Sequence, residues 1–337
     1  MSDTLLPVLS RLASGETLTS EEATTAFETI LGGEATPAQI GAFLMGLCVR
    51  GETIDEITAG AQVLRRHMAQ VEAPEDALDT CGTGGDGAGT YNISTAAALV
   101  AAACGARIAK HGNRAMSSQS GASDVLEALG VNLDLSPEAI AHCIAEAGLG
   151  FMTAPAHHTA MRHAAPVRRE LRHRTIFNLL GPLANPAGVK RQVLGVFAEK
   201  WVEPLAHVLH RLGSTRAWVV HGTDGLDELT TTGASVVAEL RDGKVRVFEA
   251  TPEDAGPPRA APADLTGGTA QENAAALTAL LDGASGAYRD IVLLNAAAAL
   301  CVADKAEDLR DGATQAAAAI DDGRARDVLA RLIELSS

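Results

Sequence analysis

A glycine-rich stretch in the first third of the chain could bring backbone N–H groups close to an anionic ligand. It reads GTGGDGAG from Gly82 to Gly89 and contains one acid, Asp86. So many glycines disfavour a packed strand or a stable helix, because glycine loses the most backbone entropy on ordering. An alanine-rich apolar run begins just after it, at Ser94. A glycine loop that leads into a helix N-terminus is typical of a phosphate site.

A second polar loop reads KHGNRAMSS, from Lys110 to Ser118. It follows a predicted short strand over residues 107–110, and open α/β sheets bind ligands where their strands end. Lys110 and Arg114 could supply positive charge to a phosphate, and Gly112 allows close backbone approach. The alternative is an ordinary polar surface loop. Two such loops so close in sequence favour a phosphate-bearing ligand.

A strongly basic stretch runs from residue 157 to residue 186, in a chain that is acidic as a whole. Arginine binds carboxylates through two parallel hydrogen bonds, so this stretch could hold a carboxylate-bearing ligand. The alternative is a solvated helix face, and only one or two of the charges need to point into a site. The stretch ends in NLLGPLANP, whose glycine and prolines predict a fixed turn.

An acidic loop, GTDGLDELTTTG, covers residues 222–233. Its adjacent carboxylates, Asp227 and Glu228, could bind Mg²⁺, which takes few direct carboxylates and completes its shell with water and phosphate oxygens. The alternative is an exposed acidic loop without a metal.

Other chemistries are disfavoured by the motifs. No GxSxG or HExxH sequence occurs, which argues against a hydrolase nucleophile elbow and a zinc protease helix. The glycine loop lacks the lysine of a P-loop. Its match to GxGxxG follows a short polar segment and is a weak dinucleotide signal. The sequence shows no evident Ser/His/Asp or Cys/His set, so it does not indicate covalent catalysis.

The composition bounds the class of protein. The chain has 337 residues, 47% of them hydrophobic, which suits one large or two modest domains. Its net charge of −15 argues against nucleic-acid binding and requires any polyanion site to be locally positive or metal-assisted. The scattered cysteines, without a CxxC pair, indicate a reduced, cytoplasmic protein. No apolar run approaches transmembrane length, so we expect no membrane partner.

The N-terminal part shows only helical signals. Thr36 and the proline after it start one helix, and Thr53 with Glu56 forms a capping box that starts the next. From Asp79 on, strand and helix signals alternate, which is typical of a mostly parallel sheet flanked by helices. The sequence therefore predicts the α/β class, with a small all-α domain and a large α/β domain.

These signals also predict where the two domains begin and end. The small helical domain covers residues 1–72, completed by part of 160–190, and the α/β domain covers residues 73–337. Strands are predicted at residues 107–110, 131–135, 149–153, 192–197, 217–221, 236–240 and 244–248. Asp242 and Gly243 between the last two are a hairpin turn signal. The chain from residue 270 to its end is predicted to be helical.

Together these motifs closely resemble the anthranilate phosphoribosyltransferase family. The matching segments are GTGGDG with T.N.ST, KHGNRAMSS, G.SDVLEALG, APVRREL..RTIFNLLGPLANP and DGLDELTTTG. They span about residues 79–233, and the helical ends also fit, so the resemblance covers essentially the whole chain. GTGGDG alone is shared with pyrimidine nucleoside phosphorylases, whereas KHGNR together with RTIFNLLGPLANP is specific.

The resemblance implies a fold and an activity. Family members combine a small helical domain and a large α/β domain around a cleft, usually as a homodimer formed through the helical domain. They transfer the 5-phosphoribosyl group of 5-phosphoribosyl 1-pyrophosphate to the amine of anthranilate, in tryptophan biosynthesis. They use Mg²⁺, and we expect two ions. Carried over to this chain, the same resemblance also implies the site residues.

These residues fall into three sets. The phosphoribosyl pyrophosphate set is Gly82, Gly85, Asp86, Thr90, Asn92, Ile93, Ser94, Thr95, Lys110, His111, Gly112, Asn113, Arg114, Ala115, Met116, Ser117, Ser118 and Ala122. The anthranilate set is Gly82, Asn113, Arg168 and, beside the entry path, His158. The metal set is Ser94, Asp227 and Glu228. No catalytic acid or base is expected, because positioning and electrostatic stabilisation can serve this chemistry.

The alternative function is a pyrimidine nucleoside phosphorylase of the same fold, which uses inorganic phosphate. The KHGNR loop and the arginine-rich stretch disfavour it. A relative of this fold that binds nucleic acid is disfavoured by the negative net charge.

Overall fold

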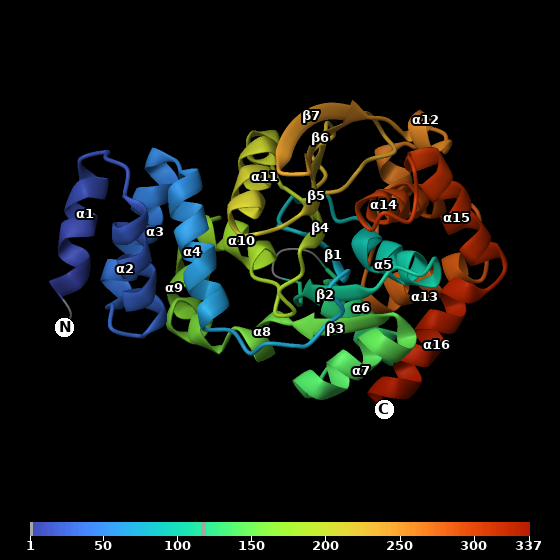
Figure 1. Cartoon of the computed structure of the whole chain (residues 1–337), viewed down its shortest axis with the longest axis horizontal. Helices are drawn as coiled ribbons and strands as arrows, with labels where there is room; N and C mark the ends of the chain where they lie inside the picture. Colours follow the sequence, from blue (N-terminus) through green and yellow to red (C-terminus); the bar gives the residue numbers. More distant parts are fainter. Residues whose placement is uncertain (1–2, 116–118) are drawn as a thin grey trace.

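Threonine caps set the starts of the N-terminal helices. Thr19, Thr36 and Thr53 each accept a hydrogen bond from the backbone N–H three residues on, within a capping box. The structure, a computed structural model, describes residues 3–115 and 119–337. Figure 1 shows the N-terminal helices together at one end of the molecule. After a 3-10 turn (Asp3–Leu5), they are α1 (Leu6–Ala13), α2 (Ser20–Leu31), α3 (Pro37–Arg50) and α4 (Ile54–Arg66).

A segment from the middle of the chain packs with these helices. The Phe27 ring meets Phe43 edge-on at 5.3 Å between centroids and Phe177 at 6.1 Å. Part of the predicted 160–190 segment therefore shares the core of the N-terminal helices, while the domain boundary at residue 72 stays a prediction. The segment comprises α8 (Ala154–His157), α9 (Ala165–Leu171), α10 (Ile176–Leu180) and the 3-10 turns Thr159–His163 and Gly181–Leu183.

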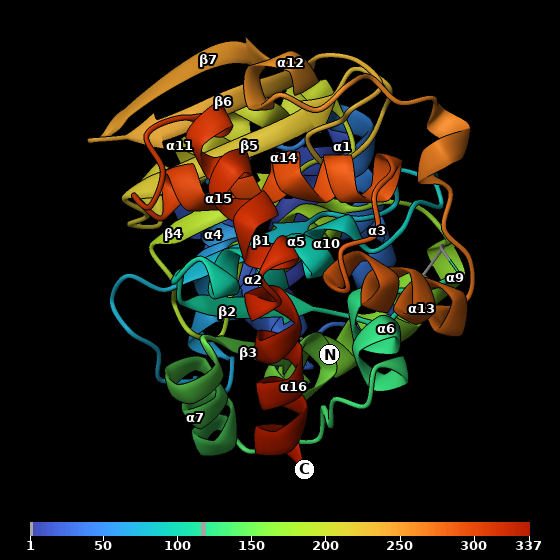
Figure 2. The same ribbon diagram turned by 90° about the vertical axis from the view of Figure 1, so that its right-hand side faces the viewer.

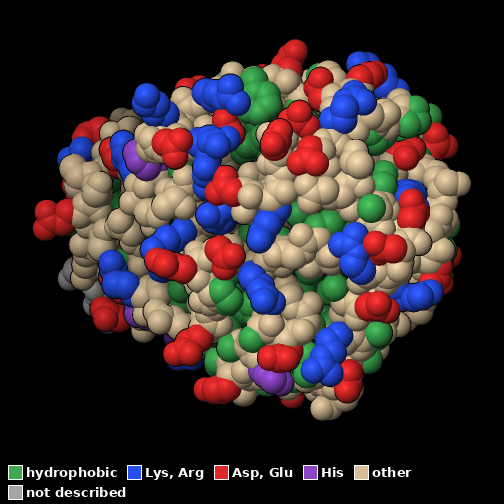
Figure 3. Space-filling model, turned by 45° about the vertical axis from the view of Figure 1, so that its right-hand side comes forward, with side chains coloured by type: hydrophobic (Ala, Val, Ile, Leu, Met, Phe, Trp, Pro, Cys, Tyr) green, Lys and Arg blue, Asp and Glu red, His purple; other side chains and the backbone are tan. Residues whose placement is uncertain are grey.

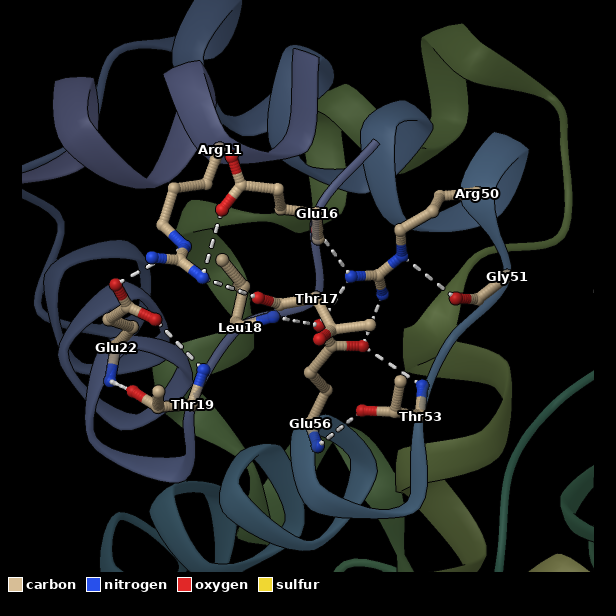
Figure 4. Close-up of polar contacts among 10 residues, drawn as sticks. All are labelled: Arg11, Glu16, Thr17, Leu18, Thr19, Glu22, Arg50, Gly51, Thr53 and Glu56. Atoms are coloured by element: carbon tan, nitrogen blue, oxygen red, sulfur yellow. Dashed lines mark hydrogen bonds and ion pairs between the residues drawn. The ribbon is translucent and has the colours of Figure 1, made fainter. Parts of the chain in front are cut away.

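A buried ion pair joins the loops of the helical part (Figure 4). The Glu56 carboxylate is fully buried and accepts the backbone N–H groups of Leu18 and Thr53, each at 2.9 Å. The Arg50 guanidinium bonds to the same carboxylate, at 2.8 Å for its Nη1, and also donates to Gly51 O at 3.1 Å. One side-chain pair thereby fixes the turn before α2 and the turn between α3 and α4.

Removing one partner of this pair should destabilise the chain strongly. Arg50→Met leaves the Glu56 charge buried without its counter-ion, and we expect a loss of about 3 kcal/mol in the free energy of unfolding. Urea unfolding measures the change. The matched control is Arg326→Met, which breaks an exposed ion pair with Asp282 and should change stability by less than about 0.5 kcal/mol. Equal effects of the two substitutions would contradict this role of Arg50.

The rest of the chain is built around one seven-stranded sheet with the order β3-β2-β1-β4-β5-β6-β7. The pairs from β3 to β5 are parallel, and β6 and β7 add an antiparallel hairpin. The strand order reverses its direction after β1, so β1 and β4 flank the switch point where such sheets bind ligands. The strands are β1 (Leu78–Gly82), β2 (Ile108–Gly112), β3 (Leu149–Thr153), β4 (Arg191–Gly195), β5 (Arg216–Gly222), β6 (Ser235–Arg241) and β7 (Lys244–Ala250).

Helices cover both faces of the sheet, as Figure 2 shows. Alanine-rich α5 and α14 pack closely against each other over one face, in the larger core cluster. On the other face, α11 packs on β5 and β6 and contacts α4 of the helical part. The remaining helices are α5 (Ile93–Ala103), α6 (Ala122–Ala128), α7 (Pro137–Ala147), α11 (Val202–Arg211), α12 (Pro252–Ala255), α13 (Ala270–Leu281), α14 (Ala287–Val302), α15 (Leu309–Asp321) and α16 (Arg324–Ser336), with 3-10 turns at Glu199–Trp201 and Pro262–Leu265.

The predicted fold class is confirmed, and one predicted strand is wrong. Residues 131–135 alternate in polarity like a strand, but they form an extended connection between α6 and α7. The Asn132 N–H donates to Ser336 Oγ at 3.1 Å, so this backbone pairs with α16 and with no strand. The Asp242-Gly243 hairpin turn is confirmed, with positive φ at both residues. Among the described helices, none is long and apolar enough to cross a membrane.

Candidate active site

Two paired glycines at the ends of β1 and β4 let the acidic loop approach the sheet. Gly82 pairs with Gly195 in the parallel register. A Cβ at Gly195 would lie 1.6 Å from the backbone O of Asp227, and a Cβ at Gly82 would lie 2.5 Å from Asp227 Oδ2. Only glycine fits at these positions while the loop stays in place. Gly195 was missed by sequence reasoning, since a glycine at a strand end gives no sign of which loop it faces.

The glycine loop is held by three separate elements. The Gly84 N–H donates to Asp227 Oδ2 at 2.6 Å. One residue earlier, Thr83 Oγ1 accepts the Phe197 N–H at 3.0 Å, and one residue later the Gly85 carbonyl accepts from Arg174 at 2.6 Å. The loop thus joins the exit of β4, the acidic loop and the basic segment.

Three carboxylates gather at this point. Burial raises the pKa of Asp227, and the neighbouring Asp86 charge raises it further. Burial also raises the pKa of Glu228, with the Asp227 charge adding to the shift and Lys110 opposing it. Within the described residues, no group of three or more His, Cys, Asp or Glu side chains is arranged to hold a metal ion by itself. A divalent ion here would therefore need oxygens from a bound phosphate as well.

Lys110 lies in β2 and is 2% exposed. Its Nζ donates to the backbone O of Thr80 and to Ser94 Oγ, the latter at 3.3 Å. The Lys110 charge and the Ser94 backbone N–H both oppose the rise in the pKa of Glu228. The structure thereby brings Lys110 together with Ser94 and Glu228, as a buried positive charge beneath the acidic pair.

The start of α5 is fixed by side chains from distant segments. The Asn92 side chain donates to Ser120 O at 3.2 Å, and its Oδ1 accepts from Asn273 at 2.9 Å. The Thr95 hydroxyl is buried and has no hydrogen-bond partner among the described atoms. Nearby, Ile93 is buried, and Thr90 forms an isolated bridge with Thr266 at the end of the glycine loop.

The second loop turns toward α6. The Arg114 guanidinium pairs with Asp124 at 3.1 Å and with Glu127 at 2.5 Å, so its charge is already engaged. The Ala115 N–H donates to the same Asp124 carboxylate at 2.9 Å, close to Ala122 at the start of α6. Asn113 is exposed, and Gly112 ends β2. Met116, Ser117 and Ser118, also predicted for this site, lie outside the described residues.

The residues predicted for anthranilate come from three elements. The His158 ring meets His111 at 5.0 Å between centroids, and both are buried. Burial lowers the pKa of His158 to about 4, so its ring is neutral at physiological pH. The Arg168 guanidinium lies 5.4 Å from the centre of the Phe177 ring, beside the helical part. Arg174, which sequence reasoning did not single out, instead reaches the glycine loop.

Two protein-family models match the chain. A helical bundle domain of a glycosyl transferase family matches residues 6–68, and the a/b domain of a glycosyl transferase family matches residues 74–326. The second match covers more than half of the chain, so the chain belongs to this glycosyl transferase family.

Similar proteins narrow the membership. The anthranilate phosphoribosyltransferase of Parvibaculum lavamentivorans is 63% identical over 326 residues, which are 97% of this chain and 96% of the relative. The crystal structure of the Thermus thermophilus enzyme of that name has a TM-score of 0.92 at 44% identity, over 97% of this chain and 98% of that one. The Saccharomyces cerevisiae enzyme in complex with PRPP and Mg has a TM-score of 0.92 at 28% identity, over 100% and 98%. Within the family, the chain is a member of the anthranilate phosphoribosyltransferase branch.

The glycine at the end of β4 offers a direct test of this geometry. Gly195→Ala should displace the peptide at Asp227 and break the Gly84–Asp227 hydrogen bond, at a cost of about 2–3 kcal/mol in stability. Urea unfolding and amide hydrogen exchange at Gly84 measure both effects. The control is Gly181→Ala, since Gly181 has φ −51° and a Cβ there meets nothing within 4 Å. Unchanged exchange at Gly84 in Gly195→Ala would show that the close approach does not hold the loop.

Proposed function

We propose that this chain transfers the 5-phosphoribosyl group of 5-phosphoribosyl 1-pyrophosphate to the amine of anthranilate. The products are N-(5-phosphoribosyl)anthranilate and pyrophosphate, in tryptophan biosynthesis. The observation that carries the proposal is the acidic loop bound to the glycine loop at the sheet's switch point, through Gly84 and Asp227. Membership of the anthranilate phosphoribosyltransferase branch supports the choice of substrates.

The glycine loop and the start of α5 are the proposed pyrophosphate site. Gly82, Gly85 and Asp86, with the Thr90–Thr95 segment, would face the leaving group, and residues 110–115 with Ala122 would face the rest of the substrate. Lys110 would supply a fixed positive charge at the start of α5, since its Nζ is bonded to Thr80 O and Ser94 Oγ. Backbone N–H groups and a fixed buried cation stabilise developing negative charge without reorganising.

Mg²⁺ suits the acidic loop. Asp227 and Glu228 with Ser94 would hold it, and we propose two ions. The fit rests on the donor set, since two adjacent carboxylates and a hydroxyl leave coordination positions for phosphate oxygens. The yeast relative is in complex with PRPP and Mg. When bound, the metal neutralises charge on the departing pyrophosphate.

Anthranilate would bind with its carboxylate at Arg168 and its ring near Asn113, Gly82 and His158. In the reaction, its amine nitrogen forms a bond to C1 of the ribose while the bond from C1 to the pyrophosphate oxygen breaks. The amine then releases a proton to solvent or to the departing pyrophosphate. A neutral aromatic amine needs no strong base for this attack, so orientation of the two substrates is the main contribution of the side chains.

We also propose a cytoplasmic homodimer, formed through the helical part, that binds neither nucleic acid nor membrane. On the face drawn in Figure 3, the described acidic and basic side chains are interspersed. The net charge of −15 further disfavours a nucleic-acid partner.

The decisive assay measures pyrophosphate release by the whole chain with Mg²⁺. Release should require both 5-phosphoribosyl 1-pyrophosphate and anthranilate, and should match the N-(5-phosphoribosyl)anthranilate formed. Release that does not depend on anthranilate would contradict the proposal. Phosphorolysis of thymidine in its place would favour the alternative, a pyrimidine nucleoside phosphorylase.

Arg168→Ala should raise the KM for anthranilate by about 10- to 100-fold, which corresponds to the loss of a charged hydrogen bond. The KM for the phosphoribosyl substrate should change little, because Arg168 is assigned to the anthranilate carboxylate alone. Arg169→Ala is the matched control, since it removes the neighbouring exposed arginine from the same helix. Equal increases in both KM values would remove Arg168 from the anthranilate site.

The Mg²⁺ requirement should depend on pH. Burial raises the pKa of Asp227 and Glu228, so these groups hold protons at a higher pH than ordinary carboxyls. A metal must displace those protons, and the half-saturating Mg²⁺ concentration should rise as the pH falls below neutral, by up to about tenfold per unit for each proton. Steady-state assays at several pH values measure it, corrected by a protein-free Mg²⁺–substrate titration. A flat profile, or an unchanged Mg²⁺ requirement in Asp227→Asn with Glu228→Gln, would exclude this site.

A further inference from the structure

A buried asparagine on α14 holds the backbone of the acidic loop. Asn295 is 3% exposed and comes from a helix far along the chain. Its Oδ1 accepts the Leu229 N–H at 3.0 Å, and its Nδ2 donates to Leu229 O at 2.8 Å and to Ile291 O at 2.9 Å. The one side-chain amide therefore satisfies both backbone groups of the residue that follows Glu228.

This clamp completes the fixation of the acidic pair. Asp227, the first residue of the pair, accepts the Gly84 N–H through its side-chain Oδ2. After the pair, Leu229 is bound by Asn295, and its own side chain is fully buried. The acidic pair is consequently held by groups distant in sequence, through the Asp227 side chain on one side and through the Leu229 backbone on the other.

An amide is well suited to this position for an electrostatic reason. Burial and neighbouring carboxylate charges already raise the pKa of both Asp227 and Glu228. A lysine or arginine in the place of Asn295 would neutralise these carboxylates and compete with a metal ion, and an acid would add repulsion. A neutral amide fixes the backbone and leaves the charge of the site unchanged.

The same helix also supports the glycine loop. Tyr288, two turns before Asn295 on α14, stacks on Tyr91 at 4.4 Å between ring centroids. Tyr91 directly follows Thr90 at the end of the glycine loop. Burial raises the pKa of the Tyr288 phenol, and the nearby Glu228 charge adds to this rise. One face of α14 thus contacts both loops of the site.

We propose that Asn295 is a positioning residue that sets the geometry of Asp227 and Glu228 for a divalent cation. The inference rests on the proposed role of these two carboxylates as metal ligands. Asn295 itself touches neither substrate nor metal in this account. It acts through the Leu229 peptide, as outer residues commonly orient metal ligands.

The test measures Mn²⁺ binding to the whole chain in the presence of 5-phosphoribosyl 1-pyrophosphate, by electron paramagnetic resonance. Asn295→Leu keeps a similar volume and removes both hydrogen bonds to Leu229. We expect the Kd for Mn²⁺ to rise about 10- to 100-fold. The half-saturating Mg²⁺ concentration in the activity assay should rise with it, while the KM for anthranilate stays near its native value. Asn295→Gln, which keeps the amide, should recover part of the metal affinity.

Ser336→Ala is the control for a purely structural effect. Ser336 is 1% exposed and bonds a distant loop through the Asn132 N–H, so its loss should lower stability without changing Mn²⁺ affinity. If Asn295→Leu does not fold, Asn295→Ser provides the same comparison with a smaller change. A folded Asn295→Leu or Asn295→Ser variant with native Mn²⁺ affinity would overturn the inference. Absence of Mn²⁺ binding or of anthranilate-dependent turnover in the native chain would instead contradict the proposed function.

Discussion

The structure of the site depends on how closely the peptide at Asp227 approaches the ends of β1 and β4. Gly82 and Gly195 lie side by side there, and a Cβ at Gly195 would fall 1.6 Å from Asp227 O. Because neither glycine carries a side chain, the acidic loop enters the switch point of the sheet. The Asp227 carboxylate can then bind the Gly84 N–H, which places the acidic loop and the glycine loop in direct contact.

This contact suggests how an acidic chain could bind a pyrophosphate-bearing substrate. The carboxylates are a liability for a phosphate ligand unless a divalent cation lies between them, and burial raises the pKa of both Asp227 and Glu228. Lys110 contributes the opposite charge from beneath, through Ser94. Neutral groups such as the Asn295 amide then fix the backbone without disturbing this balance.

The sequence alone predicted the loops of the site, whereas the residues that hold these loops in place became apparent only from the fold. The glycine loop, the capping box of Thr53 and the hairpin at Asp242 were predictable because each follows from local backbone preferences. Nothing local links Asn295 to Leu229 or Gly195 to Asp227, since both contacts depend on the strand order. Residues 131–135 show the reverse failure: their alternation is strand-like, but their backbone partner is α16.

The central claim is that a divalent cation joins the acidic loop to a pyrophosphate held by the glycine loop. The most direct measurement is anomalous X-ray diffraction at the manganese edge, from crystals of the chain with Mn²⁺ and 5-phosphoribosyl 1-pyrophosphate. We predict a manganese peak between the pyrophosphate oxygens and the Asp227 and Glu228 carboxylates, with the pyrophosphate against residues 82–95. Manganese bound by the pyrophosphate alone, away from both carboxylates, would contradict the account.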